Sequence, residues 1–172
     1  MPEAINLLSL YDLDFNEEIA ETADTIEGNA LLKSQTIAQK TGISCFADDS
    51  GLLVDALNGA PGVYSARYAG EQKNDSNNID KLLAELQDKE NRKAHFKTVM
   101  ALVLEGKEYL FEGTIHGHIS HERKGNNGFG YDPVFIPDGY SKTFAEMSFE
   151  EKNSISHRKI ALKKLLEFLG TV

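Results

Sequence analysis

The chain has 172 residues, of which 41% are hydrophobic and 26% are charged, and this composition is typical of a folded globular protein rather than a disordered or fibrous one. Its 27 acidic and 18 basic residues give a formal net charge of −9, which disfavours binding to nucleic-acid polymers and to anionic membranes. The sequence has no apolar run of about 20 residues and no basic, cleavable leader, so we expect a cytoplasmic protein that forms a single domain over residues 1–172 and does not span a membrane.

The first elements predicted along the chain are a strand, a helix and a second strand. The short apolar run "INLLSL" at residues 5–10 is typical of a buried strand. Between residues 25 and 40 apolar side chains recur at helical spacing, which predicts a helix with one solvent-exposed face. Asp24 or Thr25 can cap the start of this helix, and Gly42 can end it. The run "ISCFA" at residues 43–47 predicts another buried strand, and the adjacent Asp48 and Asp49 are expected at its carboxyl end.

The second half of the chain predicts an amphipathic helix at residues 75–87 and then two long strands, 94–104 and 108–120, joined by a hairpin turn. A last helix is expected from about residue 151 to residue 168. The predicted class is therefore α/β, with a mixed sheet flanked by helices. The single cysteine, Cys45, lies in an apolar stretch and is expected to be an inert core residue in a reducing compartment.

The neighbouring carboxylates of Asp48 and Asp49 are the first candidate functional feature. Like charges a few ångströms apart repel each other unless a cation or hydrogen bonds compensate. A hard divalent ion such as Mg²⁺ would compensate them, and it commonly takes its other ligands from water and substrate phosphates. The alternative is that one aspartate caps a turn while the other is solvated, and the spacing alone leaves both readings open.

A second candidate feature is the glycine-rich stretch "GNNGFGYDP" at residues 125–133. Glycines let the backbone approach a ligand closely, and an exposed Phe129 would offer a surface on which a nucleobase can stack. A plain surface loop with a phenylalanine anchored in the core is the alternative.

A third candidate feature, "EEKNSISHR" at residues 150–158, places Lys152, His157 and Arg158 near the start of the last predicted helix. Cations at a helix start oppose the helix dipole, so their presence favours a ligand carbonyl or phosphate as their partner. Pairing with the neighbouring Glu150 or Glu151 is the alternative.

Taken in order, four stretches closely resemble the inosine/xanthosine triphosphate pyrophosphatase family: "ETADTIEGNALLKSQ", "FADDSGLLVDALNGAPGVYSARYAG", "GFGYDPVF" and "EEKNSISHRKIAL". The resemblance implies an elongated α/β fold around a twisted mixed sheet, with two lobes and a central nucleotide cleft. It implies hydrolysis of the non-canonical purine triphosphates ITP, dITP and XTP to the monophosphate and pyrophosphate, which cleanses the nucleotide pool. Mg²⁺ as cofactor and a homodimer are also implied.

The same resemblance assigns roles to particular residues. Asp49 is expected to bind the metal and to accept a proton from the attacking water, and Glu21 is expected to be a second metal ligand. The expected substrate contacts are Lys33, Asp48, Ser50, Gly51, Phe129, Gly130, Tyr131, Asp132, Lys152, His157 and Arg158.

One part of the family pattern is not found in the printed sequence. Family members begin with a strand and a Ser/Thr-x-Asn-x-x-Lys phosphate loop, so this chain is expected to be truncated at its N-terminus relative to the family. Two other functions therefore stay open. One is a catalytically impaired nucleotide-binding dimer, and the other is a related pyrophosphatase for non-canonical pyrimidine nucleotides.

Overall fold

The computed structural model describes residues 5–171. The helices are α1 (Ile26–Thr41), α2 (Asp75–Glu85), α3 (Phe149–Ile155) and α4 (His157–Leu169). The strands are β1 (Cys45–Val54), β2 (Lys93–Leu104), β3 (Lys107–Ile119) and β4 (Phe135–Pro137). Short 3₁₀ helices lie at Asp55–Leu57, Gly62–Arg67 and Phe144–Glu146.

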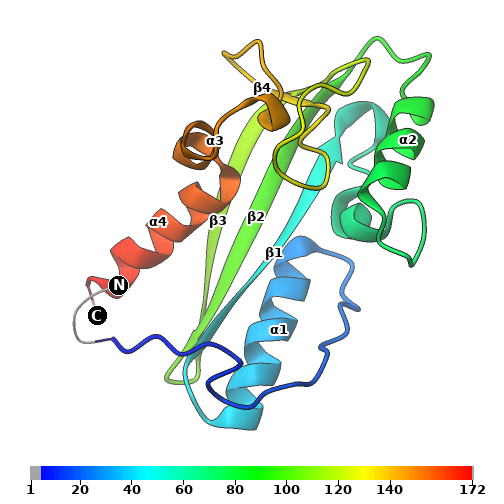
Figure 1. Ribbon diagram of the computed structural model, residues 1–172. Helices are drawn as coiled ribbons and strands as arrows, with labels where there is room; N and C mark the ends of the chain where they lie inside the picture. The colour runs from blue at the N-terminus through cyan, green and yellow to red at the C-terminus, as the bar shows by residue number, and fades with distance from the viewer. Residues whose placement is uncertain (1–4, 172) are drawn as a thin grey trace.

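The strands form one twisted sheet in the order β1-β2-β3-β4. The long β2–β3 hairpin gives the molecule its elongated shape, with helices on both faces of the sheet (Figure 1). The expected α/β class with helices flanking the sheet is therefore confirmed. All strand pairs within the described residues are antiparallel. The expected mixed sheet would also contain a parallel pair of strands, and the described residues form none.

The helix α1 covers one face of the sheet. Its predicted limits are confirmed, because the Thr25 side chain accepts a hydrogen bond from the Gly28 backbone N–H and Gly42 ends the helix in the left-handed conformation. Ile26 and Ala30 are buried against β2. This packing fixes the direction in which the polar face of α1 presents its side chains.

On the opposite face, α4 buries Ala161 and Leu165 against Met100 of β2. The wider end of the sheet, with α2, α3 and β4 around it, holds a larger core that includes Leu52, Leu82, Phe96, Phe135 and Phe144. The expected helix at residues 75–87 is confirmed as α2, and the expected hairpin is confirmed as β2 and β3.

The turn between β2 and β3 shows why the hairpin was predictable. Glu105 and Gly106 both have positive φ angles, of 50° and 78°, as a two-residue turn between twisted antiparallel strands requires. A glycine at the second position adopts this conformation without steric cost.

The prediction of a strand at residues 5–10 is wrong. This segment belongs to no strand, and Leu7, Leu8 and Leu10 are exposed. The Asp12 carboxylate accepts hydrogen bonds of 2.7 Å from both the backbone N–H and the hydroxyl of Ser9, and this local turn competes with an extended conformation.

Two predicted boundaries also need correction. The strand expected at residues 43–47 continues to Val54, so Asp48 and Asp49 lie within β1 and not at its end. The last helix is interrupted at Ser156, whose extended backbone separates α3 from α4 and whose hydroxyl caps α4 by accepting from the Lys159 N–H.

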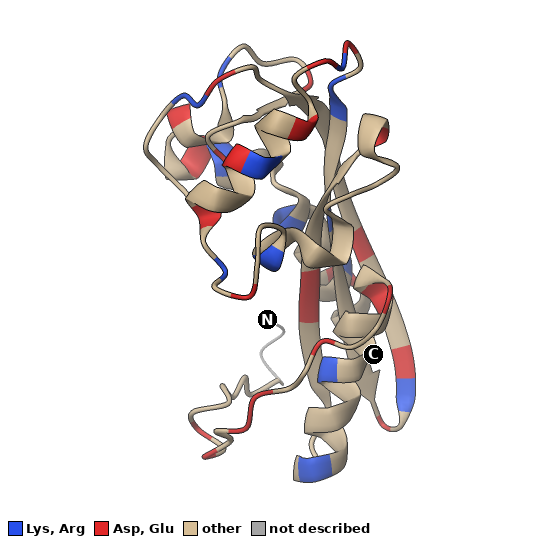
Figure 2. Cartoon of the chain, turned by 90° about the vertical axis from the view of Figure 1, so that its right-hand side faces the viewer, with Lys and Arg blue, Asp and Glu red and all other residues tan. Residues whose placement is uncertain are grey.

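Among the described helices, none is both long enough and apolar enough to cross a bilayer. Acidic and basic residues are interspersed along the elements seen in Figure 2.

Candidate functional site

Three charged side chains from different elements meet on the α1 side of the sheet. The ammonium of Lys33, on α1, lies 2.9 Å from the carboxylate of Asp49 on β1 and 3.0 Å from that of Glu21, in the segment before α1. We call Glu21, Lys33 and Asp49 the carboxylate cluster. Asp49 is only 9% exposed, so the cluster lies at the edge of the protein interior.

The electrostatics of the carboxylate cluster keep Lys33 charged. Burial alone would lower the pKa of Lys33, but the hydrogen bonds to Asp49 and Glu21 outweigh it, so the pKa is raised. Burial raises the pKa of Asp49, and the charge of Glu21 adds to this, while the Lys33 hydrogen bond opposes it. Lys33 thus serves as the counter-charge of two acids in this structure.

A second cation, which the sequence did not indicate, borders the carboxylate cluster. The guanidinium of Arg67 lies 3.8 Å from the Glu21 carboxylate, and Arg67 donates a hydrogen bond of 3.4 Å to the Glu21 backbone carbonyl. The run "YSARYAG" that contains Arg67 was part of the family resemblance, but no pattern in the sequence brought this residue near Glu21.

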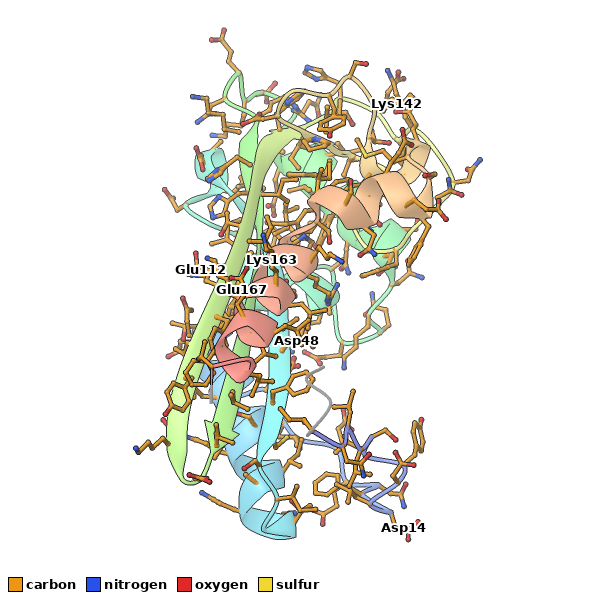
Figure 3. The ribbon with its side chains drawn as sticks, turned by 90° about the vertical axis from the view of Figure 1, so that its left-hand side faces the viewer. Asp14, Asp48, Glu112, Lys142, Lys163 and Glu167 are labelled. Carbon is orange, nitrogen blue, oxygen red and sulfur yellow. The ribbon has the colours of Figure 1, made fainter. Side chains whose placement is uncertain are left out.

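The structure separates the two neighbouring aspartates. Because successive side chains of a strand point to opposite faces, Asp49 faces α1 while Asp48 faces α4. The Asp48 carboxylate accepts a hydrogen bond of 3.2 Å from Nε of Arg158. Figure 3 shows Asp48 on β1 beside α4. The expectation that both carboxylates share one counter-ion is therefore corrected, since each has a basic partner of its own.

Ser50 and Gly51 were expected to contact the substrate, and the structure places both residues within β1. The Ser50 hydroxyl shares a 2.6 Å hydrogen bond with the Thr98 hydroxyl of β2. A Cβ atom on Gly51 would lie 2.4 Å from the Gly62 carbonyl oxygen, so only glycine fits there. In this structure Gly51 allows the backbone of β1 to pack closely against the backbone at Gly62.

A second cluster lies on the α4 side of the sheet. The ring of Phe129 is 62% exposed, and the ammonium of Lys152 and the guanidinium of Arg158 lie 4.7 and 5.6 Å from its centroid. We call Phe129, Lys152 and Arg158 the aromatic cluster. An exposed ring with cations beside it is suited to a flat, electron-rich ligand.

Buried polar contacts shape the loop that carries Phe129. The carboxylate of Asp132, itself buried, accepts a 2.9 Å hydrogen bond from the Phe129 backbone N–H and forms an ion pair with Lys152. Gly130 has a φ of 59°, and its N–H donates to the Asp75 carboxylate at 2.7 Å. Asp132 and Gly130 thus hold the loop in shape and position the aromatic cluster.

Tyr131, another expected substrate contact, has its side chain in the core of the described structure. Its side chain is only 4% exposed, and its hydroxyl donates a 2.8 Å hydrogen bond to the Ser65 carbonyl. The alternation of the loop turns Phe129 outward and Tyr131 into the core. Tyr131 therefore anchors the loop.

His157, at the start of α4, is buried beside the aromatic cluster. Its ring stacks on Phe96, with centroids 4.8 Å apart and planes 8° apart, and its Nδ1 has no hydrogen-bond partner within the described residues. Burial, with further contributions from the charges of Arg158 and Lys152, lowers the pKa of His157 to about 3. The imidazole is therefore neutral at physiological pH.

Within the described residues, no group of three or more His, Cys, Asp or Glu side chains could hold a metal ion by itself. The carboxylate cluster nevertheless has the chemistry of a site completed by its ligand. Two carboxylates already converge on one cationic atom, Lys33 Nζ. Hard divalent ions are commonly bound by one or two carboxylates, with water and substrate phosphates as the other ligands.

A cavity of about 870 Å³ lies between the segment before α1 and strand β1. Its lining is largely apolar and includes Lys33 of the carboxylate cluster and Asp48, the partner of Arg158. The half-buried Cys45 also lines it, and burial raises the pKa of this thiol, which disfavours the reactive thiolate.

Comparisons with known proteins identify the family of this chain. The model of the Ham1 family matches residues 1–168. The chain is 57% identical over 169 residues to a dITP/XTP pyrophosphatase of Flavobacterium johnsoniae, a match that covers 98% of this chain and 88% of the relative. It is 53% identical over 170 residues to a dITP/XTP pyrophosphatase of Christiangramia forsetii, covering 99% of this chain and 90% of that relative.

Solved structures give the same result. The Ham1 protein of Staphylococcus aureus superposes with a TM-score of 0.92 at 43% identity, covering 96% of this chain and 87% of that one. A nucleoside-triphosphatase, dITP/XTP pyrophosphatase, of Mycobacterium abscessus superposes with a TM-score of 0.84 at 47% identity, covering 98% of this chain and 87% of that one. The match over nearly the whole chain, in sequence and in fold, shows that this protein belongs to the Ham1 family.

Proposed function

We propose that this protein hydrolyses the triphosphates of deaminated purines, ITP, dITP and XTP, to the nucleoside monophosphate and pyrophosphate, and so removes them from the nucleotide pool. The relatives named dITP/XTP pyrophosphatase support this substrate class. The observation that carries the proposal is the position of two adjacent residues of β1. Asp49 belongs to the carboxylate cluster, and Asp48 pairs with Arg158 of the aromatic cluster. Within the described residues β1 is an edge strand of the sheet, so one nucleotide that lies across this edge can engage both clusters.

The carboxylate cluster is the proposed place of bond cleavage. Asp49 accepts a proton from the attacking water and orients that water, as a carboxylate close to its substrate can do. Lys33, whose ammonium is already held between two acids, provides a positive charge for the polyphosphate. Arg67 adds a second positive charge beside Glu21.

Mg²⁺ is the proposed cofactor, and Glu21 and Asp49 are the residues that would hold it. When bound, a divalent ion of this kind neutralises phosphate charge and lowers the pKa of bound water. Burial of Asp49 strengthens its electrostatic interactions with any cation at this place, because the local dielectric constant is low.

The aromatic cluster is the proposed place of base recognition. The exposed ring of Phe129 stacks on the base, and Arg158 donates hydrogen bonds to its 6-keto oxygen. Neutral His157 adds a polar contact without an additional charge. Adenine carries a 6-amino group, which is a hydrogen-bond donor, at the same position. The donor of the base would then face the donors of Arg158. Such unpaired buried groups cost about 1–3 kcal/mol each.

The test is to measure pyrophosphate release from ITP, XTP, dUTP and ATP with Mg²⁺ present. Preferential turnover of ITP and XTP is expected. A preference for dUTP would instead support a pyrimidine pyrophosphatase, and no release from any nucleotide would support a nucleotide-binding protein without catalysis.

We also propose that the protein is a cytoplasmic homodimer. Light scattering coupled to size-exclusion chromatography tests the dimer, which is expected at twice the 19.0 kDa chain mass. A mass equal to one chain at micromolar concentration would contradict it. Fractionation of the source cells tests the cytoplasmic location.

A further inference from the structure

Two buried asparagines occupy equivalent places in the fold, and only one of them is fully hydrogen-bonded. Asn29 is the fourth residue of α1 and is 0% exposed, and Asn78 is the fourth residue of α2 and is 2% exposed. In each case the side-chain oxygen accepts a hydrogen bond from a backbone N–H in the segment before the helix. The donors are Ala23 at 2.9 Å and Ala69 at 2.7 Å.

The amide nitrogens of the two side chains differ. Nδ2 of Asn78 donates to the carbonyl oxygens of Ser65 and Ala66, at 3.4 and 3.0 Å. Nδ2 of Asn29 is buried and has no hydrogen-bond partner within the described residues. The Ala23 N–H fixes the orientation of the Asn29 amide, because a flipped side chain would set two donors against each other.

A buried donor without a partner is costly, so an unpaired donor next to a functional site calls for an explanation. Asn29 lies one helical turn before Lys33 on the same side of α1, and the Lys33 ammonium contacts the Asp49 carboxylate at 2.9 Å, so the Asn29 amide lies on the side of α1 that faces Asp49. Because Asn29 is fully buried, no substrate atom reaches it in this structure, and its acceptor would be a protein group or a buried water.

We propose that Asn29 is a positioning residue of the Ham1 site, and that its Nδ2 donates to the Asp49 carboxylate when Lys33 turns from Asp49 to a bound polyphosphate. Its Oδ1 meanwhile holds the Ala23 backbone and, through it, the segment that carries Glu21. One side chain thus fixes both acids of the carboxylate cluster. This inference rests on the proposed function, since it assigns a role within the same site.

The test compares Asn29→Asp with the matched control Asn78→Asp. Both variants keep the oxygen that accepts the backbone N–H and lose the amide donor. For Asn29→Asp we expect kcat for XTP to fall roughly 10- to 100-fold, the range found for residues that support metal ligands, while KM changes little. For Asn78→Asp we expect a lower melting temperature with an unchanged kcat per folded molecule. An unchanged kcat in Asn29→Asp, or a loss explained by its unfolded fraction alone, overturns the proposal.

A second measurement does not depend on turnover or on the folding of either asparagine variant. With pyrophosphate added, the side-chain amide signals of ¹⁵N-labelled protein are compared with those of Asp49→Asn. A shift of the Asn29 signal with an unmoved Asn78 signal is expected, and an unmoved Asn29 signal overturns the proposal. If the wild-type protein releases no pyrophosphate from any nucleotide, the proposed function fails, whereas this spectrum still decides whether Asn29 contacts Asp49.

Discussion

The carboxylate cluster and the aromatic cluster lie on opposite faces of β1 and differ in how their charges are satisfied. In the carboxylate cluster, Asp49 is 9% exposed and shares the Lys33 ammonium with Glu21. In the aromatic cluster, Phe129 is 62% exposed and Arg158 keeps contact with solvent, while Lys152 is paired with the buried Asp132. An enclosed set of charges is suited to catalysis because its groups are pre-oriented, whereas an open ring is suited to binding a base that enters and leaves.

This difference predicts two kinds of kinetic defect. Substitutions in the carboxylate cluster should lower kcat, because the interactions there matter most in the transition state. Substitutions in the aromatic cluster should raise KM or change the ranking of substrates, because the base is bound in the same way before and during the reaction.

The largest effect is expected for Asp49→Asn. The amide cannot accept the proton of the water, so kcat for XTP should fall by roughly 10²- to 10⁴-fold, the usual contribution of a general base, and further if a metal ligand is lost as well. Pyrophosphate release and a thermal melt measure activity and fold. Asp80→Asn, at an exposed aspartate of α2, is the control and should keep full activity. Activity of Asp49→Asn within tenfold of wild type would refute the assignment.

Phe129→Ala should affect binding more than turnover. Loss of base stacking costs about 1–3 kcal/mol, which corresponds to a rise in KM of about 5- to 150-fold with kcat nearly unchanged. Initial rates over a range of XTP concentrations separate the two constants. Phe149, which is 78% exposed at the start of α3, provides the control Phe149→Ala. Equal KM values for the two variants would contradict stacking on Phe129.

The pH dependence of stability should reveal the burial of His157. Its pKa is about 3 in the folded protein, against 6.5 when unperturbed, so between these values the unfolded chain binds a proton that the folded protein does not. The free energy of unfolding should therefore fall as the pH is lowered from 7 to 5.5, by about 1 kcal/mol from this residue. Urea unfolding at both pH values should show this loss in the wild type and not in His157→Phe. An identical loss in both proteins would mean that His157 is not buried in its neutral form.

A smaller effect is expected for Arg158→Gln. The Asp48–Arg158 pair is largely exposed, so its loss should change stability by less than about 1 kcal/mol. Loss of a charged donor to the 6-keto oxygen should lower the preference for XTP over ATP by up to about tenfold. The ratio of kcat/KM for the two nucleotides measures this preference. Lys163→Gln removes a different exposed pair on α4 and should leave the ratio unchanged.

Much of the fold was predictable because local signals agreed with the tertiary structure. Thr25 and Gly42 marked the ends of α1, and the turn at Glu105 and Gly106 marked the β2–β3 hairpin. The conformation of residues 5–10 was not predictable in the same way, since the apolar composition of this segment was outweighed by the turn that Asp12 makes with Ser9. Composition alone does not show this competition.

The sequence predicted which residues form the candidate site better than it predicted how they are arranged. The sequence indicated Lys33 and Asp49, but it placed Asp48 on the same side, because acidic residues at mid-strand looked like the end of a strand. Burial of Tyr131 depends on its contact with Ser65, which is distant in sequence. Arg67 and Asn29 were missed for the same reason, because only the tertiary fold brings them to the carboxylate cluster.

The central claim is that two separate clusters bind the two ends of one nucleotide. The most direct measurement is amide NMR of the ¹⁵N-labelled protein with Mg²⁺, titrated once with pyrophosphate and once with xanthosine. Pyrophosphate is predicted to shift the signals of Glu21 and Lys33, and xanthosine those of Phe129 and Arg158. Xanthosine shifts confined to the carboxylate cluster, or pyrophosphate shifts confined to the aromatic cluster, would contradict the account.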